Sequence, residues 1–276
     1  MSSSFDLSST DGVRAFRKII YDFFCKNGRT LPWRTDYNPY HIYISEVMLQ
    51  QTQVDRVIPK FSYFIDEIPS FEALASAPFS KVLSVWQGLG YNRRAQSLQK
   101  AAHVITTDYN GILPDDPEKL VLLPGIGKAT AASITAFAFN KPTLFLETNI
   151  RTVYIHHFFG DEQTVPDEKL LALAQSALDM KNPRKWYSAL MDYGSHLKKE
   201  FGNATRKSKE YKKQSSFIGS RRQLRGKVLK LLLDNKKHKP DDILEYLGTE
   251  QERCTEVLSL LLKENLVNYE NGRYFI

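Results

Sequence analysis

The feature that most constrains this chain is a glycine turn set between two helical patterns. Residues 122–134 read Leu-Leu-Pro-Gly-Ile-Gly-Lys-Ala-Thr-Ala-Ala-Ser-Ile. Gly125 and Gly127 leave the main chain unhindered, so that several N–H groups can point at one anion where the next helix begins. The motif predicts a turn that holds a nucleic-acid phosphate through Gly125, Gly127, Lys128 and Thr130 without reading a base. The alternative is an ordinary packing corner between two helices.

Apolar side chains recur at helical spacing along most of the chain, and nothing before residue 266 reads convincingly as a strand. The sequence therefore predicts an all-α fold. The predicted helices cover residues 11–27, 41–59, 60–67, 70–76, 79–86, 93–109, 116–121, 128–139, 150–159, 167–178 and 183–195.

A second, smaller unit follows a basic segment. Its sequence predicts helices over residues 220–234, 240–247 and 250–265, and then two short strands around Asn271-Gly272. Three helices and a hairpin suggest a winged helix. We therefore divide the chain into a domain of residues 1–214 and a small winged-helix-like domain of residues 215–276.

The last predicted helix of that small domain carries glutamates and few basic residues. Reading of a DNA groove by this helix is therefore not favoured, and contact with a protein partner or a structural role is weighed equally. The acidic residues are Glu250, Glu252, Glu256 and Glu264.

Positive charge is concentrated in one block. Residues 197–240 carry fifteen Lys and Arg against three acids, whereas the whole chain is only +7, so the remainder is net negative. A polyanion favours such a block because each neutralised phosphate releases counterions. Neutral substitutions at Arg221, Arg222 and Arg225 should accordingly flatten the salt dependence of binding. The alternative for residues 203–214 is a solvated, disordered linker.

Cysteine content and apolar runs bear on the compartment. Cys25 and Cys254 are too few for a disulfide framework or a metal cluster, and both are predicted to be buried thiols. The apolar runs are far shorter than a bilayer span, and the first ten residues show no signal pattern. We expect a soluble, cytoplasmic and nucleoid-associated monomer of bacterial or archaeal type, with no membrane contact.

One acid stands out within a predicted helix. Residues 45–54 read Ser-Glu-Val-Met-Leu-Gln-Gln-Thr-Gln-Val, which places Glu46 next to Val47 and Met48. Desolvation favours the protonated form of such a carboxyl group, and a general acid needs that environment.

Five segments together resemble the helix-hairpin-helix DNA glycosylases, and most closely the MutY-type adenine glycosylases. The resemblance implies two α-helical lobes with the glycine turn near the mouth of a cleft. It also implies a duplex DNA partner, from which adenine mispaired with guanine or 8-oxoguanine is removed. It extends over roughly residues 12–197. The segments are Leu-Pro-Trp-Arg at 31–34, residues 45–54, Gly-Leu-Gly-Tyr at 88–91, residues 122–134, and Met-Asp-Tyr-Gly at 191–194.

The resemblance also implies roles for individual residues. Glu46 protonates N7 of adenine, and Glu147 opposes the positive charge on the sugar or attacks its anomeric carbon. Gln51 and Tyr91 enter the duplex and fill the gap that the extruded nucleotide leaves. The other implied residues are Trp33, Arg34, Ala129 and Asn149 in the base pocket and Gln50 on DNA.

Three of these residues also have a simpler explanation. Glu147 can be an acid that the helix dipole favours. Gln51 can be a solvated helix residue and Tyr91 a packed aromatic. Two rival functions also stay open. One is a mismatch thymine or uracil glycosylase of the same fold. The other is a catalytically inactive mismatch-binding protein, which the altered positions Ala129 and Glu147 suggest.

The chain departs from the family at several positions. Ala129 stands where the lyase branch has the lysine that forms a Schiff base, so that route to strand cleavage is excluded. Glu147 replaces an aspartate and is one methylene longer. After Gly194 the family usually has four cysteines that bind an iron–sulfur cluster, whereas this chain has His196, Lys198 and Lys199.

We therefore expect no iron–sulfur cluster, as in clusterless members of the family, in which packing replaces the metal. The family implies a monovalent cation held by main-chain carbonyls of the glycine turn. Its carboxy-terminal domain, which resembles a nucleotide pyrophosphohydrolase, is too long for residues 215–276.

Overall fold

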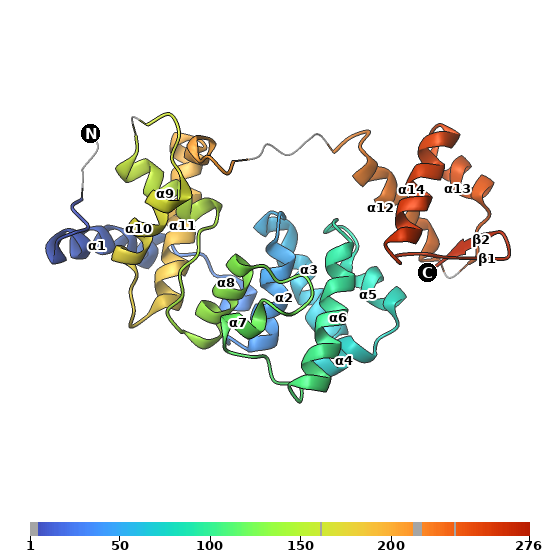
Figure 1. The fold of residues 1–276 in the computed structure, drawn as a ribbon, viewed down its shortest axis with the longest axis horizontal. Helices are drawn as coiled ribbons and strands as arrows, with labels where there is room; N and C mark the ends of the chain where they lie inside the picture. Colours follow the sequence, from blue (N-terminus) through green and yellow to red (C-terminus); the bar gives the residue numbers. More distant parts are fainter. Residues whose placement is uncertain (1–4, 161, 212–216, 235) are drawn as a thin grey trace. The chain divides into compact units, whose positions relative to one another are not determined.

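The computed structural model describes residues 5–160, 162–211, 217–234 and 236–276, and these are mostly helical (Figure 1). Residues 212–216, where the basic linker was expected, and the first four residues lie outside this description. The chain divides into two compact units. Unit 1 comprises Met1–Glu46, Pro114–Leu122 and Ile126–Lys213, and unit 2 comprises Val47–Leu113, Leu123–Gly125 and Gln214–Ile276. None of the described helices is long and apolar enough to cross a membrane.

Unit 1 is built around an aromatic core in which Phe16, Tyr154 and Trp186 are fully buried. The ring of Phe16 lies 5.7 Å from that of Tyr154 and 6.2 Å from that of Trp186. These rings join three helices that pack together in Figure 1, namely α1, α9 and α11. The elements are α1 (Thr10–Asn27), η1 (Pro32–Arg34), α2 (Pro39–Leu49, which continues into unit 2), α7 (Pro117–Leu120), α8 (Lys128–Phe139), α9 (Thr148–Phe158), α10 (Asp167–Ala177), α11 (Pro183–Phe201) and η2 (Ala204–Lys207).

Unit 2 contains a four-helix lobe and the C-terminal domain. Gln96 on α6 donates to the carbonyl oxygens of Glu264 at 3.1 Å and Asn265 at 3.0 Å, and Phe79 packs against the core of the C-terminal domain. The elements are α3 (Val54–Glu67), α4 (Phe71–Ser76), α5 (Phe79–Trp86), α6 (Arg93–Asp108), α12 (Arg221–Leu232), α13 (Pro240–Leu247), α14 (Gln251–Lys263), β1 (Asn268–Glu270) and β2 (Arg273–Phe275).

The C-terminal elements agree with the sequence-based expectation. Over residues 217–234 and 236–276 the described structure has helices α12, α13 and α14 followed by the hairpin. Strands β1 and β2 pair antiparallel, and both turn residues have positive φ, 49° at Asn271 and 72° at Gly272. Paired positive φ values are the mark of a type I′ turn, which Asn-Gly favours.

The predicted helix over residues 41–59 is wrong. Helix α2 ends at Leu49 and α3 begins at Val54, and between them Gln51 has a φ of 56°. The chain has no Gly or Pro at this break. The free carbonyl groups at the end of α2 are instead satisfied by Arg94, which is distant in sequence and gives no local signal.

The prediction that both cysteines are buried is also wrong, because Cys25 is exposed and Cys254 is buried. Helix α1 turns Phe16 and Ile20 to the core. Cys25 follows Ile20 by five residues, which places it about 140° away around the helix, outside the buried stripe.

Candidate active site

Glu46 and Ser133 form the centre of the candidate site, and both belong to unit 1. Glu46 lies on α2 among the buried residues Tyr43, Val47 and Met48. Ser133 lies on α8 and donates from its Oγ to Glu46 Oε2 at 2.6 Å, and the same Oγ lies 3.0 Å from the Thr130 carbonyl oxygen.

This hydroxyl group suits both protonation states of Glu46. When the carboxyl group is ionised, Ser133 donates to it. When the carboxyl group is protonated, Ser133 can accept a hydrogen bond from the carboxyl O–H and donate its own to the Thr130 carbonyl, because a hydroxyl both donates and accepts. The pair can therefore hold and release a proton without rearranging α2 or α8.

Burial, and to a smaller extent the negative charge of Glu147, raise the pKa of Glu46 to about 7, although the hydrogen bond from Ser133 and the charge of Arg34 act in the opposite direction. A carboxyl group with this pKa is protonated in a useful fraction of molecules near neutral pH. The effect of Glu147 on Glu46 also means that the two carboxyl groups share one electrostatic environment.

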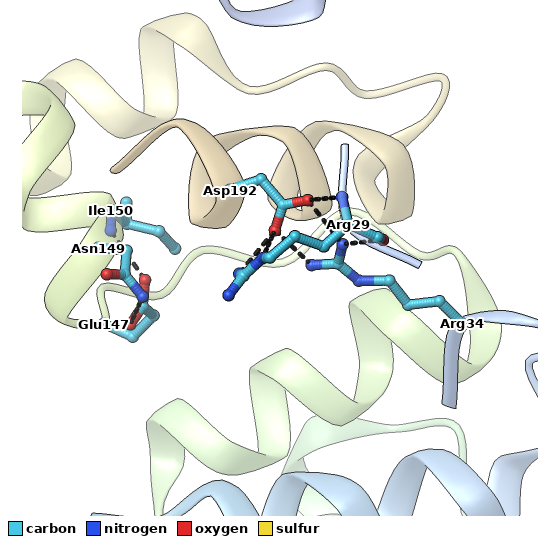
Figure 2. Close-up of polar contacts among 6 residues, drawn as sticks. All are labelled: Arg29, Arg34, Glu147, Asn149, Ile150 and Asp192. Carbon is cyan, nitrogen blue, oxygen red and sulfur yellow. Dashed lines mark hydrogen bonds and ion pairs between the residues drawn. The ribbon is translucent and has the colours of Figure 1, made fainter. Parts of the chain in front are cut away.

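Glu147 is the N-cap residue of α9, as Figure 2 shows. Its Oε1 accepts from the main-chain N–H of Ile150 at 2.8 Å, and its Oε2 accepts from the Asn149 side-chain amide at 3.3 Å. Glutamate is an unusual N-cap residue, since Asp, Asn, Ser and Thr are preferred. Glu147 is thus an acid at the start of a helix, as the simpler explanation holds, and its charge also raises the pKa of Glu46.

The two carboxyl groups differ in their hydrogen-bond donors. Burial keeps the pKa of Glu147 above its ordinary value, and the main-chain N–H groups of Asn149 and Ile150 and the charges of Arg151 and Lys198 reduce this rise. Donors that face an ionised carboxylate stabilise its charge. Glu147 thus faces several hydrogen-bond donors, whereas Glu46 faces the Ser133 hydroxyl.

A buried carboxylate, Asp192, fixes the loop before α2 (Figure 2). It accepts from the main-chain N–H of Arg29 at 2.7 Å and pairs with the guanidinium groups of Arg29 at 2.6 Å and Arg34 at 3.0 Å. Arg34, expected in the base pocket, is therefore oriented from α11 by Asp192. Asp192 belongs to the Met-Asp-Tyr-Gly segment, and an acid inside an apolar helical face was the only sequence signal for this role.

Gly194 explains another part of that motif. A Cβ added to Gly194 would lie 2.1 Å from the carbonyl oxygen of Asn149. Helix α11 therefore approaches the start of α9 so closely that any side chain at this position would displace it. The glycine thus sets the position of Asn149 and of the Glu147 cap beside it.

The glycine turn joins α7 to α8 as predicted. Gly125 has a φ of 82°, and Gly127 is the N-cap of α8, with no atom within 4 Å of the position its Cβ would take. Gly127 and Lys128 are exposed. The start of α8 therefore presents open main-chain N–H groups and a positive charge, an arrangement that suits a phosphate.

Gln51 and Tyr91 lie on two turns of unit 2, and both have positive φ, 56° and 49° respectively. Such backbone conformations are uncommon for residues other than glycine and gather at functional sites. Both residues are exposed, and 36% of the Tyr91 surface is accessible. Gln50, on the first of these turns, donates to the Gly125 carbonyl at 3.4 Å.

Arg94 ties these two turns together, and the sequence analysis missed it. Its guanidinium donates to the carbonyl oxygens of Val47, Met48 and Gln50 at 2.9, 2.8 and 2.6 Å, and to that of Gly90 at 3.1 Å. Burial lowers the pKa of Arg94 to about 10, so the group is charged at neutral pH. A basic residue directly after a glycine turn was the only local signal.

The remaining predicted pocket residues differ in exposure. Trp33 lies in the buried core, whereas Ala129 is exposed on the first turn of α8. Asn149 is half-buried and bonded to Glu147.

The donor set of the chain does not fit an iron–sulfur cluster. Cys25 lies on α1 in unit 1 and Cys254 on α14 in unit 2, and the chain has two cysteines in total. Such a cluster needs four protein ligands, mostly cysteine thiolates.

The segment after α11 is held by hydrogen bonds. Thr205 in η2 lies 2.9 Å from Thr152 through their hydroxyl groups and donates to the Thr148 carbonyl at 3.2 Å. Val165 exchanges main-chain hydrogen bonds with Lys207 and Lys209 at 2.8 and 3.1 Å. These contacts fasten η2 to α9, the helix that carries the Glu147 cap.

Comparisons with known proteins agree on one superfamily. Residues 44–177 match the HhH-GPD superfamily of base excision DNA repair proteins. The chain is similar to the adenine DNA glycosylase of Mycolicibacterium smegmatis (strain ATCC 700084 / mc(2)155), with 33% identity over 230 residues that cover 75% of this chain and 76% of the relative. It is 38% identical over 182 residues to the adenine DNA glycosylase of Buchnera aphidicola subsp. Baizongia pistaciae (strain Bp), which covers 65% of this chain and 52% of that relative.

A solved structure supports the same fold. A thermostable thymine-DNA glycosylase superposes with a TM-score of 0.59 at 26% identity, over 66% of this chain and 86% of that one. The chain spans about half the length of the Buchnera aphidicola relatives that it matches.

Proposed function

Because this chain belongs to the HhH-GPD superfamily of base excision DNA repair proteins, we propose that it is a DNA N-glycosylase. It hydrolyses the bond between adenine and deoxyribose in duplex DNA where adenine faces guanine or 8-oxoguanine. The observation that carries this proposal is the carboxyl pair in unit 1. Glu46 has a pKa near 7, and the charge of the capped Glu147 acts on it.

Glu46 is the proton donor in this scheme. Its proton passes to N7 of the extruded adenine, the electrons of the C1′–N9 bond leave with the base, and the sugar becomes an oxocarbenium ion. Protonation is needed because an anionic adenine is a poor leaving group. The Ser133 hydroxyl stabilises Glu46 before and after the transfer.

Glu147 stabilises the positive sugar. The hydrogen bonds from Ile150 and Asn149 hold its carboxylate in place, and an oriented charge needs no reorganisation when the oxocarbenium ion forms. Water then adds to C1′ and passes a proton to the Glu46 carboxylate, which is thereby returned to its protonated form. This completes hydrolysis and leaves an abasic site in the strand.

DNA itself is held by main-chain and wedge groups. Gly127 and Lys128 grip a phosphate, while Gln51 and Tyr91 replace the extruded nucleotide in the base stack. Main-chain oxygens of the turn suit a monovalent cation, and neither that ion nor an iron–sulfur cluster takes part in the steps above. We propose that the protein acts as a monomer at the nucleoid.

A second candidate is a mismatch thymine or uracil glycosylase, which the structural similarity to a thymine-DNA glycosylase favours. The carboxyl pair can serve either base, because both reactions pass through the same sugar cation. A third candidate is an inactive mismatch-binding protein, because the Glu147 carboxylate is engaged as the N-cap of α9.

One assay separates the three. Duplexes that contain one A·G, A·8-oxoguanine, T·G or U·G pair are incubated with the protein, the released base is identified, and the strands are examined with and without alkali. We expect release of adenine and strand breaks only after alkali. Release of thymine or uracil would establish the second candidate, and binding without any release would establish the third.

A further inference from the structure

The C-terminal domain contacts the wedge residue directly. Arg222, in the first turn of α12, donates from its Nη1 to the hydroxyl group of Tyr91 at 3.0 Å, and its guanidinium lies 5.9 Å from the centre of the Tyr91 ring. Both residues belong to unit 2. The contact joins positions 131 residues apart, so the docking of the domain and not the local sequence creates it.

The other arginines at this end of α12 are paired within the C-terminal domain. Arg221 lies 3.1 Å from Glu256, and Arg225 forms a salt bridge with Glu264. The acidic helix α14 thus offsets the charge of two α12 arginines. The guanidinium of Arg222 also reaches out of the domain, to the hydroxyl group of Tyr91.

The docking has its own fixed contacts. Gln96 holds the end of α14 through the carbonyl oxygens of Glu264 and Asn265 at 3.1 and 3.0 Å. Phe79 packs against the small apolar core of the domain. The position of Arg222 beside Tyr91 therefore follows from an interface with both polar and apolar parts.

We propose that Arg222 forms part of the DNA-reading surface and donates hydrogen bonds to the purine left unpaired opposite the extruded nucleotide. If Tyr91 enters the base stack next to that purine, Arg222, which is bonded to Tyr91, lies at the edge of the purine. A guanidinium fork matches the acceptors of a purine such as guanine, which offers O6 and N7. The N-terminus of α12 adds partial positive charge at the same place.

The small C-terminal domain would then supply base recognition through one side chain, while its third helix α14 stays away from the groove. This assigns a function to the domain that the acidic composition of α14 left open. Because the role of Arg222 rests on the proposed function, the test must separate failure of this role from failure of catalysis.

The test compares binding of three full-length variants to duplexes with a single adenine opposite guanine, 8-oxoguanine or an abasic analogue. We expect Arg222→Ala to weaken binding about tenfold opposite a purine and to leave binding opposite the abasic analogue nearly unchanged. Lys230→Ala removes the same charge from the same helix two turns further on, so it should affect all duplexes equally. Gln96→Ala loosens the docking and should reproduce part of the Arg222→Ala effect.

Equal losses on all duplexes with Arg222→Ala would show a phosphate contact, and no loss would show that α12 stays off DNA; either result overturns the assignment. Thermal unfolding of each variant identifies any loss of folding. Tyr91→Phe keeps the ring and removes the hydrogen bond to Arg222. If Tyr91→Phe weakens binding as much as Arg222→Ala does, Arg222 acts only by positioning Tyr91. If the wild-type protein binds the duplexes with different affinities according to the base opposite adenine but releases no base, the proposed function fails. The proposed contact of Arg222 with the purine would still stand.

Discussion

At the level of single residues, the pKa of Glu46 is set by its surroundings. Glu46 is one of many acids in the chain, and its pKa near 7 comes chiefly from burial on α2. Ser133 and Arg34 lower this pKa and Glu147 raises it, so three residues from separate elements tune one carboxyl group. Each of these influences can be removed by a single substitution.

Ser133→Ala should shift the pH dependence of excision. The hydrogen bond from Ser133 lowers the pKa of Glu46, so its loss raises that pKa and keeps Glu46 protonated to higher pH. The single-turnover rate, measured from about pH 5 to pH 9, should therefore begin to fall at a higher pH on the alkaline side of its pH profile. Thr135→Val removes another buried hydroxyl from α8, bonded to the Ala131 carbonyl, and should leave the pH profile in place. A lower rate without a shift would make Ser133 merely structural.

Glu46→Gln should abolish excision, retain duplex binding and stabilise the protein at alkaline pH. The pKa of Glu46 is higher in the folded chain than in the unfolded one, so its favourable contribution is complete below about pH 4.5 and is lost as pH rises through about 7. Glutamine avoids this loss. We expect the variant to gain about 2–4 °C in Tm at roughly pH 8 and little at roughly pH 5. An equal change at both values would contradict the burial of a titrating carboxyl group.

At the level of elements, the site depends on close contacts between helices and turns. Helix α11 carries Asp192, which orients Arg34, and Gly194, which lets α11 approach Asn149. Arg94 on α6 plays a similar part for the turns that carry Gln51 and Tyr91. These residues act through others, so their substitution should disturb geometry rather than chemistry.

Gly194→Ala should displace the start of α9. The new Cβ would meet the Asn149 carbonyl at 2.1 Å, and overpacking of this kind costs about 1–3 kcal/mol. Excision should fall because Asn149 and Glu147 move together. Gly226→Ala in α12 is the matched control, since its Cβ would meet nothing within 4 Å, and it should be neutral or slightly stabilising in urea denaturation.

Arg94→Lys should loosen both wedge turns. Lysine keeps the charge but cannot reproduce the fork of hydrogen bonds to Val47, Met48 and Gln50. We expect a loss of about 1–3 kcal/mol in the free energy of unfolding. We also expect weaker extrusion of the target nucleotide, which is measured by the fluorescence of 2-aminopurine placed in the duplex. Arg93→Lys, on the exposed neighbour, should change neither. Normal extrusion with Arg94→Lys would show that the turns are held by other contacts.

At the level of the whole molecule, charge is distributed differently from what the sequence alone suggests. The sequence predicts that Arg221, Arg222 and Arg225 neutralise DNA phosphates together. In the structure Arg221 and Arg225 are paired with Glu256 and Glu264, so part of their charge is offset within the C-terminal domain.

Removal of these two acids should strengthen nonspecific binding. A Glu256→Ala and Glu264→Ala double variant releases two arginines, and the slope of log affinity against log salt should steepen by up to about 2. Glu250→Ala with Glu252→Ala removes the same charge at the start of α14 and should steepen the slope less. Equal slopes would show that the ion pairs do not limit phosphate contact.

Much of the fold was predictable because local patterns dominate it. The helical spacing, the Asn-Gly hairpin and the glycine turn before α8 all depend on residues close in sequence. The break after Leu49 was not predictable, since Arg94 from α6 satisfies the free carbonyl groups there. The exposure of Cys25 was missed because apolar neighbours do not by themselves show which side of a helix faces the core.

The sequence by itself determined the helical class, the turn that suits a phosphate and the acids available for catalysis, because these follow from residue type and short-range spacing. Only the folded chain fixed the surroundings of Glu46, because its burial and its hydrogen bond with Ser133 bring together residues far apart in the sequence. It also decided the contact between Arg222 and Tyr91, because docking of two parts of unit 2 creates it. Electric fields and close packing act through space, and the order of residues along a chain does not fix distances in space.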